Sequence, residues 1–552
     1  MADYININIK DGKPEIVEKY AVLSDIARRY AHTCKYPILL AKVNNQLEEL
    51  TKRLTGDCYI EFLDLTDPNG YRTYQRSVAF LMICAAKEIL GIETRIVVEH
   101  SINKNYYCEL TRGGLRLTED MVKQIEERMT ELVSRDLPIK KFSIPTEEGI
   151  EIARKMGLHD KERFLKYRRT ANVNFYRLDW FYDYFYGHIV PSTGYLKVFK
   201  LIREMDGLML QFPDNKDPGV MSEIKPHEKI SRIFMESSKW ARIMKVDTVP
   251  ALNDIICNRG SKEIIRVNEA LHEKKISNLA DMIYQRGKKI VLIAGPSSSG
   301  KTTFANRLAV QLNASGLTPR VISLDDYYLD RDKIPFGEDG TQDFETIDAF
   351  DVDGFNNDVE RLLKGEEVEI PHFNFLTGHR EYKGKLFKLK NTDVIVVEGI
   401  HGLNEKVAMN VKHGVKFRIF ISALTQLSID DHNRIPTSDT RLLRRLVRDV
   451  TTRGIDPAVN IGMWPKVAQS EALHIFPHQE NADAMFNSAL VYELCVIKQY
   501  VEPLLFSIEK FQPEYTEARR LLKFLDSFLT ISPDEVPSNS LLREFIGGSS
   551  FS

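Results

Sequence analysis

Residues 295–302 read Gly-Pro-Ser-Ser-Ser-Gly-Lys-Thr, the spacing of a loop that wraps a phosphate chain. Small residues let successive backbone amides point inward, and the helix that follows adds the positive end of its dipole. Lys301 would reach the β- and γ-phosphates, and the Thr302 hydroxyl would ligate Mg²⁺. An apolar strand-like run precedes the loop and a helical run follows it, so a serine-rich turn without function is a weak alternative. We expect ATP and Mg²⁺ to bind through Gly295, Ser297, Ser298, Ser299, Gly300, Lys301, Thr302 and Thr303.

Acidic residues close two further strand-like runs. Glu398 follows four apolar residues, the position from which a carboxylate can hold the Mg²⁺ shell. Asp325 and Asp326 end the run RVISLDD, at the side of an open α/β sheet where ligands bind. A carboxylate there could accept a proton from a hydroxyl that attacks the γ-phosphate. Acids that merely close a buried strand or cap a turn are the structural alternative.

Five arginines fall within the thirteen positions 441–453. At helical spacing Arg441, Arg445 and Arg448 share one face, and leucines occupy another. Such a helix is typical of a lid that closes on transferring phosphates. The alternative is a solvated basic face that pairs with Asp439 and Asp449.

The elements that must position these residues lie in a chain of 552 residues, long enough for about three domains. A net charge of −2 gives no global attraction to nucleic acid or anionic membrane. The longest apolar run, residues 78–86, is half the length that spans a bilayer. The start lacks a secretory pattern, and six scattered cysteines indicate reduced thiols. We therefore expect a cytoplasmic enzyme without membrane contact.

Periodicity divides the chain into four segments. Residues 1–65 form a small α+β module, residues 66–215 mix strands with helices at 77–90 and from Thr118, and residues 216–286 are a mainly helical connector. In residues 287–552, β-rich runs at 289–295, 320–326, 393–400 and 415–422 alternate with helical stretches. This alternation predicts a parallel sheet with helices on both faces, within a multidomain α/β and α+β protein.

The C-terminal half resembles the uridine kinase and phosphoribulokinase family of P-loop kinases. The motifs that carry the resemblance, in order, are GPSSSGKTT, SLDDYY, DFETIDAFD, IPHFNFLTGHR, VVEGIHGL and DTRLLRRLVRDVTTRG. The resemblance implies that Asp325 is the catalytic base beside Tyr328, that Thr302 and Glu398 hold Mg²⁺, and that Lys301 with the lid residues Arg445 and Arg448 acts on the phosphates. The implied substrate contacts are Asp325, Tyr328, Phe344, Glu345, Phe373, Phe375, His379, Arg380 and Arg441.

Two departures from the family pattern bear on the substrate. Glu345 stands where uridine kinases carry an aspartate that holds the ribose hydroxyls. In the segment that reads the pyrimidine, the histidine is shifted by one position to His379, and Gly378 takes its usual place. A different nucleoside or another sugar-bearing alcohol therefore stays open.

The N-terminal half resembles threonyl-tRNA synthetases: residues 1–65 their β-grasp TGS module, and residues 70–210 their editing domain. AKVNNQLEELTKRL, IEFLDLTDPNG, NYYCEL and DYFYGHIVPSTGYLKVFKL carry this resemblance. The four metal-ligand positions of the editing domain become Arg76, Phe80, Phe185 and Ile189, none of which ligates Zn²⁺ here. Without an aromatic-interleaved basic patch, a scaffold or regulatory role is favoured over RNA binding.

The leading hypothesis is an ATP-dependent nucleoside kinase that phosphorylates the 5′-hydroxyl and assembles as a homo-oligomer. Among enzymes, the alternative is a phosphoribulokinase-like or pantothenate-like kinase. Among binding proteins, the alternative is a nucleotide-gated RNA-binding regulator.

Overall fold

The N-terminal segment is a β-grasp module with its own core. The computed structural model describes residues 3–114, 116–223, 228–336, 340, 342–374 and 377–551. Five strands form a sheet in the order β2-β1-β5-β3-β4, in which β1 and β5 run parallel. Their alternating apolar residues pack onto helix α1. The elements are β1 (Tyr4–Ile9), β2 (Glu15–Glu18), α1 (Leu23–Arg29), β3 (Leu40–Val43), β4 (Gln46–Glu49) and β5 (Cys58–Leu63).

The next segment is an α+β domain built around a long buried helix. Helix α2 (Pro68–Leu90) carries the apolar run that the sequence places in a helix. The prediction that it begins at Ser77 is wrong. The Asp67 carboxylate accepts hydrogen bonds from the amides of Asn69 and Gly70, and Pro68 occupies the first turn, so DPNG starts the helix.

Two antiparallel sheets, ordered β10-β9-β8 and β11-β12-β7-β6, accompany α2. The remaining elements of this domain are β6 (Arg95–Ile102), β7 (Asn105–Thr111), α3 (Glu119–Ser134), β8 (Ile139–Pro145), α4 (Thr146–Lys155), α5 (His159–Leu165), β9 (Asn172–Leu178), β10 (Phe181–Tyr184), β11 (Lys200–Glu204) and β12 (Gly207–Gln211). Three helices follow: α6 (Glu228–Ile243), α7 (Val249–Cys257) and α8 (Ser261–Gln285).

The C-terminal half contains a five-stranded parallel sheet in the order β14-β19-β13-β20-β23. Helices α8 and α9 cover one face and α10 covers the other, which confirms the predicted α/β layering. Four strands fall where the sequence predicts them, and the short β23 is additional. The elements are β13 (Ile290–Ala294), α9 (Lys301–Ala314), β14 (Thr318–Ser323), α10 (Val352–Leu363), β19 (Asp393–Glu398), β20 (Lys416–Ser422) and β23 (Ala484–Asn487).

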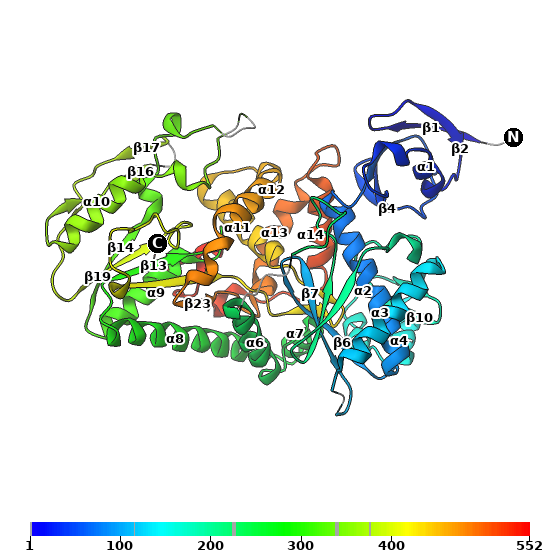
Figure 1. The fold of residues 1–552 in the computed structure, drawn as a ribbon, viewed down its shortest axis with the longest axis horizontal. Coiled ribbons are helices and arrows are strands. Elements are labelled where there is room, and N and C mark those ends of the chain that lie inside the picture. Colours follow the sequence, from blue (N-terminus) through cyan, green and yellow to red (C-terminus); the bar gives the residue numbers. More distant parts are fainter. Residues whose placement is uncertain are drawn as a thin grey trace.

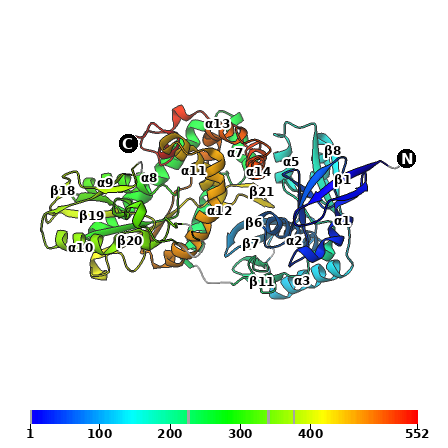
Figure 2. The ribbon, with the colours of Figure 1, turned by 90° about the horizontal axis from the view of Figure 1, so that it is seen from above.

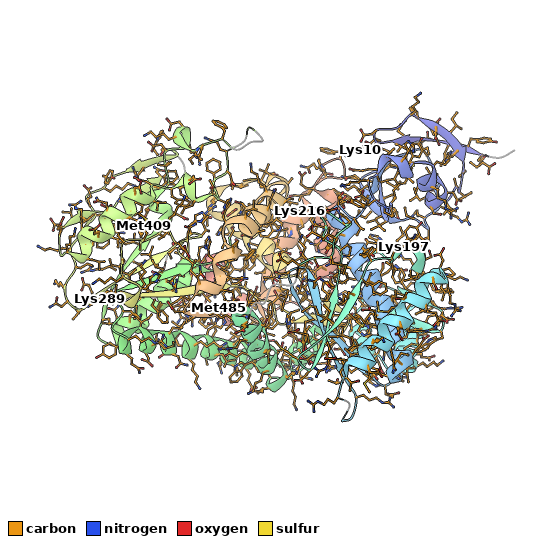
Figure 3. The ribbon with its side chains drawn as sticks, in the orientation of Figure 1. Lys10, Lys197, Lys216, Lys289, Met409 and Met485 are labelled. Atoms are coloured by element: carbon orange, nitrogen blue, oxygen red, sulfur yellow. The ribbon has the colours of Figure 1, made fainter. Side chains whose placement is uncertain are left out.

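A helical layer joins this sheet to the N-terminal half (Figures 1 and 2). One continuous hydrophobic core runs from the α+β domain through these helices. Figure 3 marks the two ends of the molecule, with Lys10 in the β-grasp module and Met409 in the kinase-like half. The helices are α11 (Thr437–Arg453), α12 (Pro457–His474), α13 (Glu493–Phe506), α14 (Tyr515–Leu525) and α15 (Arg543–Ile546).

A hairpin of the C-terminal half also docks into the α+β domain. It consists of β21 (Ser428–Asp430) and β22 (Asn433–Arg434). The Val98 amide donates to the carbonyl of Asp431 at 2.8 Å, and the Arg95 guanidinium pairs with its carboxylate at 2.7 Å. His432 Nδ1 lies 2.7 Å from the buried carboxylate of Asp183, which also pairs with Lys161. The two halves thus form one packed body. Among the described residues, no helix is long and apolar enough to cross a membrane.

Candidate active site

The loop at 295–302 has the shape that a phosphate chain requires. It connects the central strand β13 to the first turn of α9. A Cβ on Gly295 would lie 2.1 Å from the carbonyl oxygen of Ile421, so only glycine fits. Gly300 adopts a left-handed φ of 86°. The hydroxyls of Ser298 and Ser299 are buried and have no hydrogen-bond partner among the described residues. The loop therefore has the geometry to wrap a phosphate chain.

Helix α11 is bound to the outside of this loop. Arg441 Nε donates to the Ser297 carbonyl at 2.9 Å, and Arg444 lies 3.4 Å from the Ser298 carbonyl. Arg445 lies 3.2 Å from the Ser297 hydroxyl, and all three arginines are buried. In this structure α11 buries its leucines together with Arg441, Arg444 and Arg445, and its movement as a lid stays a prediction. Arg441, predicted to contact substrate, contacts the loop in this structure, and its contact with substrate stays a prediction.

Two carboxylates that the sequence analysis missed also hold the loop. The Ser297 amide donates to Glu471 Oε1 at 2.7 Å, and Glu471 pairs with Arg441. The Thr303 amide and hydroxyl donate to Glu544 at 3.2 and 2.7 Å. Glu471 belongs to α12 and Glu544 to the C-terminal α15, neither of which has a recognisable phosphate-binding motif. Only tertiary packing brings them to the loop.

Glu398 stands at the predicted metal position. The Ser323 hydroxyl donates to Glu398 Oε1 at 2.8 Å, and the Thr302 hydroxyl lies 3.4 Å from the same oxygen. Burial raises the pKa of Glu398 to about 7, assisted by the nearby charge of Asp325 and opposed by Lys301. A hydroxyl and a buried carboxylate side by side are oxygen ligands that suit Mg²⁺.

The structure distinguishes the two adjacent aspartates. Asp326 accepts from the amide of Phe373 at 3.2 Å and lies 3.1 Å from His372 Nδ1. It thereby anchors the hairpin of β16 (His372–Asn374) and β17 (His379–Glu381). Burial raises the pKa of Asp325, whereas the charges of Lys301, Arg453 and Arg448 lower it. Asp325 therefore lies close enough to Lys301, Arg453 and Arg448 for their charges to act on it, whereas Asp326 is held by contacts with the hairpin.

Glu345 and an aromatic group line the other side of the site. Burial raises the pKa of Glu345 to about 7, with the charge of Glu471 adding to it and that of Arg445 opposing it. Burial, followed by the charges of Asp325 and Glu345, raises the pKa of Tyr328. The Tyr328 ring lies 4.0 Å from that of Phe350 and 5.4 Å from that of Phe373, and its hydroxyl donates to the Phe344 carbonyl at 2.9 Å.

The remaining predicted substrate residues lie farther out. Arg380 pairs with Asp351 at 2.6 Å, and its amide donates to Asp330 at 2.9 Å. The His379 side chain is 61% exposed and lies 3.5 Å from Asp330. Phe375 lies outside the described residues. The structure thus gathers Lys301, Thr302, Asp325, Tyr328, Glu345, Glu398, Arg445 and Arg448, and leaves His379 and Arg380 on the peripheral hairpin.

In the N-terminal half, the positions that resemble metal ligands have become packing positions. Phe80, Phe185 and Ile189 are buried, and the rings of Phe80 and Phe185 meet edge to face at 5.3 Å. Arg76 donates to the carbonyl of His188 at 2.9 Å. None of these four side chains offers a lone pair to a cation.

The loop, the paired acids and the parallel sheet define a P-loop kinase domain of the class that acts on small molecules. Residues 290–493 match the model of the Phosphoribulokinase / Uridine kinase family. The C-terminal half therefore carries a domain of this family, joined to an N-terminal half similar to threonine–tRNA ligases.

Among curated proteins, the chain is 27% identical to the threonine–tRNA ligase of Syntrophotalea carbinolica over 197 residues, and 28% identical to that of Clostridium tetani over 199. Each match covers 36% of this chain and 31% of the ligase, so the chain spans about a third of these relatives.

Among solved structures, a possible uridine kinase from Bacillus stearothermophilus is 19% identical, with a TM-score of 0.27, over 39% of this chain and 98% of that one. The D-glycerate 3-kinase of Cryptococcus neoformans is 13% identical, with a TM-score of 0.22, over 48% of this chain and 89% of that one.

Proposed function

We propose that this protein transfers the γ-phosphoryl group of ATP to the 5′-hydroxyl of a nucleoside. The observation that carries the proposal is the difference in surroundings between the two adjacent aspartates, Asp325 and Asp326. Asp326 is occupied by the β16–β17 hairpin, whereas Asp325 lies close enough to Lys301 and Glu398 for their charges to interact with it. The acceptor hydroxyl gives its proton to Asp325 as its oxygen bonds to the γ-phosphorus, and the bond to ADP breaks.

Neighbouring charged residues favour the proposed roles of Asp325 and of the phosphate-binding loop. Lys301, Arg448 and Arg453 oppose the effect of burial on Asp325 and favour the carboxylate form that accepts a proton. Arg441 and Arg444 hold carbonyl groups of the loop backbone and Arg445 holds the Ser297 hydroxyl, so the phosphate-binding amides are organised before ATP arrives. Thr302 and Glu398 would hold Mg²⁺, which neutralises charge on the β- and γ-phosphates when bound.

A nucleoside is the favoured acceptor because of the groups around Asp325. Glu345 can accept hydrogen bonds from ribose hydroxyls, in place of the aspartate expected from the family pattern. Tyr328, with Phe350 and Phe373, presents aromatic surface to a planar base. Another small alcohol, such as a sugar phosphate, has no planar base to stack on these rings.

The test is a substrate panel on the purified full chain with ATP and Mg²⁺. The acceptors are the common ribo- and deoxyribonucleosides, ribulose 5-phosphate, pantothenate and glycerate. ADP release is measured, and mass spectrometry identifies the phosphorylated product. A nucleoside 5′-monophosphate is the expected product. Turnover of only a non-nucleoside would move the assignment to another acceptor, and no turnover of any alcohol would reject the kinase.

A further inference from the structure

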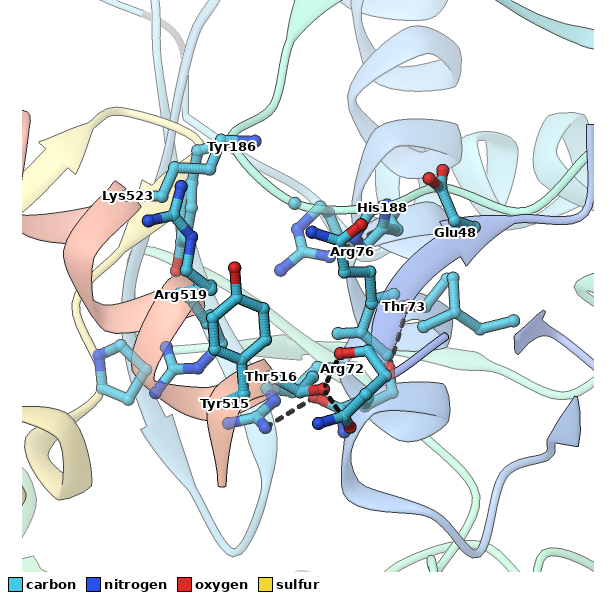
Figure 4. Close-up of a pocket in the computed structure, with 18 residues that line it drawn as sticks. Glu48, Arg72, Thr73, Arg76, Tyr186, His188, Tyr515, Thr516, Arg519 and Lys523 are labelled. Carbon is cyan, nitrogen blue, oxygen red and sulfur yellow. Dashed lines mark hydrogen bonds between the residues drawn. The ribbon is translucent and has the colours of Figure 1, made fainter. Parts of the chain in front are cut away.

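A cavity of about 330 Å³ lies where the two halves of the chain meet (Figure 4). Its walls come from the β3–β4 turn, from α2, from the segment 186–188 and from helix α14 of the C-terminal half. The volume falls within the rough range of 300–1,000 Å³ for small-molecule sites. The cavity is separate from the phosphate-binding loop, because none of residues 295–302 lines it.

The wall of this cavity is strongly basic. Its cationic side chains are Arg72, Arg76, Arg519, Arg520 and Lys523. The only carboxylate among the lining residues is Glu48, which pairs with Lys52 at 3.1 Å. Figure 4 shows Arg519 and Lys523 on one side of the cavity and Arg72 and Arg76 on the other.

Three of these five cations have no carboxylate partner in the described part of the chain. Arg72 and Arg520 share Glu517, at 3.3 and 2.7 Å. Arg76 instead donates to the carbonyl of His188 and faces the Tyr186 ring at 5.5 Å. The side chains of Arg519 and Lys523 have no hydrogen bond or ion pair with any described residue. Uncompensated like charges around a cavity repel one another, and a bound anion would remove that repulsion.

A second cavity of about 310 Å³ adjoins the first. The two share Arg72, Arg76, Tyr186 and Pro436 as lining residues. The second cavity has an aromatic wall, formed with Tyr186 by Tyr71, Tyr106 and Phe185. A basic lobe and an aromatic lobe therefore meet at Arg76 and Tyr186. This combination suits a ligand that carries a phosphate at one end and a planar ring at the other.

We propose that the paired cavities bind a small nucleotide, with its phosphate among Arg76, Arg519 and Lys523, at a site separate from the phosphate-binding loop. A small ligand is favoured over RNA because the unpaired cations face a single cavity from opposite sides. Binding an RNA strand requires cations that follow successive phosphates along the surface. This proposal does not depend on the proposed kinase activity, because none of the residues proposed for phosphoryl transfer lines either cavity.

The test uses the full chain with Lys301→Ala, so that binding at the phosphate-binding loop is weakened in every sample. Calorimetric titrations without Mg²⁺ use AMP and UMP, with pyrophosphate as the phosphate-only arm and the free nucleosides as the ring-only arm. The cavity variant adds Arg519→Ala and Lys523→Ala. The matched control adds Arg266→Ala and Lys274→Ala, an arginine and a lysine equally exposed on α8 and outside both cavities.

The cavity variant should bind a mononucleotide at least about tenfold more weakly than the matched control, because two charge-assisted contacts are lost. Thermal melts of both variants check that the fold is intact. Equal affinity in the two variants, or no mononucleotide binding in either, would overturn the proposal. Binding of a short single-stranded RNA without binding of any mononucleotide would overturn it in favour of RNA.

Discussion

The molecule contains two clusters of arginine and lysine that differ in how their charges are balanced. Around the phosphate-binding loop each buried arginine has a carboxylate: Arg441 pairs with Glu471, Arg444 with Glu493 and Arg445 with Asp449. In the interdomain cavity, Arg76, Arg519 and Lys523 have no carboxylate partner among the residues that the structure describes. Paired arginines hold a backbone in place, whereas unpaired cations around a cavity favour an anion from solution. The same residue types therefore indicate scaffolding in one region and binding in the other.

The largest expected effect concerns the chemistry at the loop. Asp325→Asn removes the proton acceptor and should lower kcat by about 10²–10⁴-fold, while ATP binding stays close to that of the wild type. Steady-state kinetics and a titration with a fluorescent ATP analogue measure the two quantities. Asp326→Asn is the matched control, and it should act mainly on KM through the β16–β17 hairpin. Equal losses of kcat in both variants would contradict the assigned base.

The second prediction sharpens the comparison between paired and unpaired cations. Arg444→Ala leaves the buried Glu493 without its partner and should lower the free energy of unfolding by about 3–5 kcal/mol. Lys523→Ala removes a cation whose pKa is lowered by burial and by neighbouring positive charges, so it should not destabilise the fold and should raise the free energy of unfolding near pH 7. Urea denaturation of both variants gives the two values. A large loss for Lys523→Ala would show that its charge stabilises the fold and would weaken the contrast.

The third prediction follows from the pKa of Glu345, raised to about 7. The folded state then holds a proton that the unfolded chain releases near pH 4.5, so stability falls as the pH rises from about 4.5 to 7. Glu345→Gln should remove on the order of 1–3 kcal/mol of this decline. Thermal unfolding of the ligand-free protein between pH 5 and 8 measures it. An unchanged slope in the variant would mean that Glu345 is ionised throughout this range.

Features that depend on local sequence pattern can be predicted from the sequence alone. The loop, four strands and the acids at the strand ends follow from spacing and periodicity. In the structure the loop and these acids lie at the carboxyl end of the parallel strands. The start of α2 is also encoded locally, because Asp67 and Pro68 are helix-start residues, but the apolar pattern alone places the start at Ser77. Short β23 offers too few residues for a periodic pattern.

Features that depend on tertiary partners could not be predicted in this way. A helical wheel places Arg441, Arg445 and Arg448 on one face, which suits an exposed lid. It cannot show that arginines of this helix pair with carboxylates from α12 and α13. Glu471 has no local signal, since a single acid in a helix is ordinary. The interdomain cavity likewise arises only when α14 packs against α2, more than 400 residues apart in the chain.

The smallest predicted effect returns to the unpaired cations. Burial, with the charges of Lys141, Arg168 and Arg76, lowers the pKa of Lys523 to about 8. Lys523 should therefore lose its proton as the pH rises from 7 to 9, and the cavity should bind a mononucleotide up to about tenfold more weakly at pH 9. Calorimetry on the Lys301→Ala chain measures the change, and in Lys523→Ala the affinity should vary less with pH. The same pH dependence in both variants would show that Lys523 does not contact the phosphate, and would leave Arg76 and Arg519 as the groups that bind it.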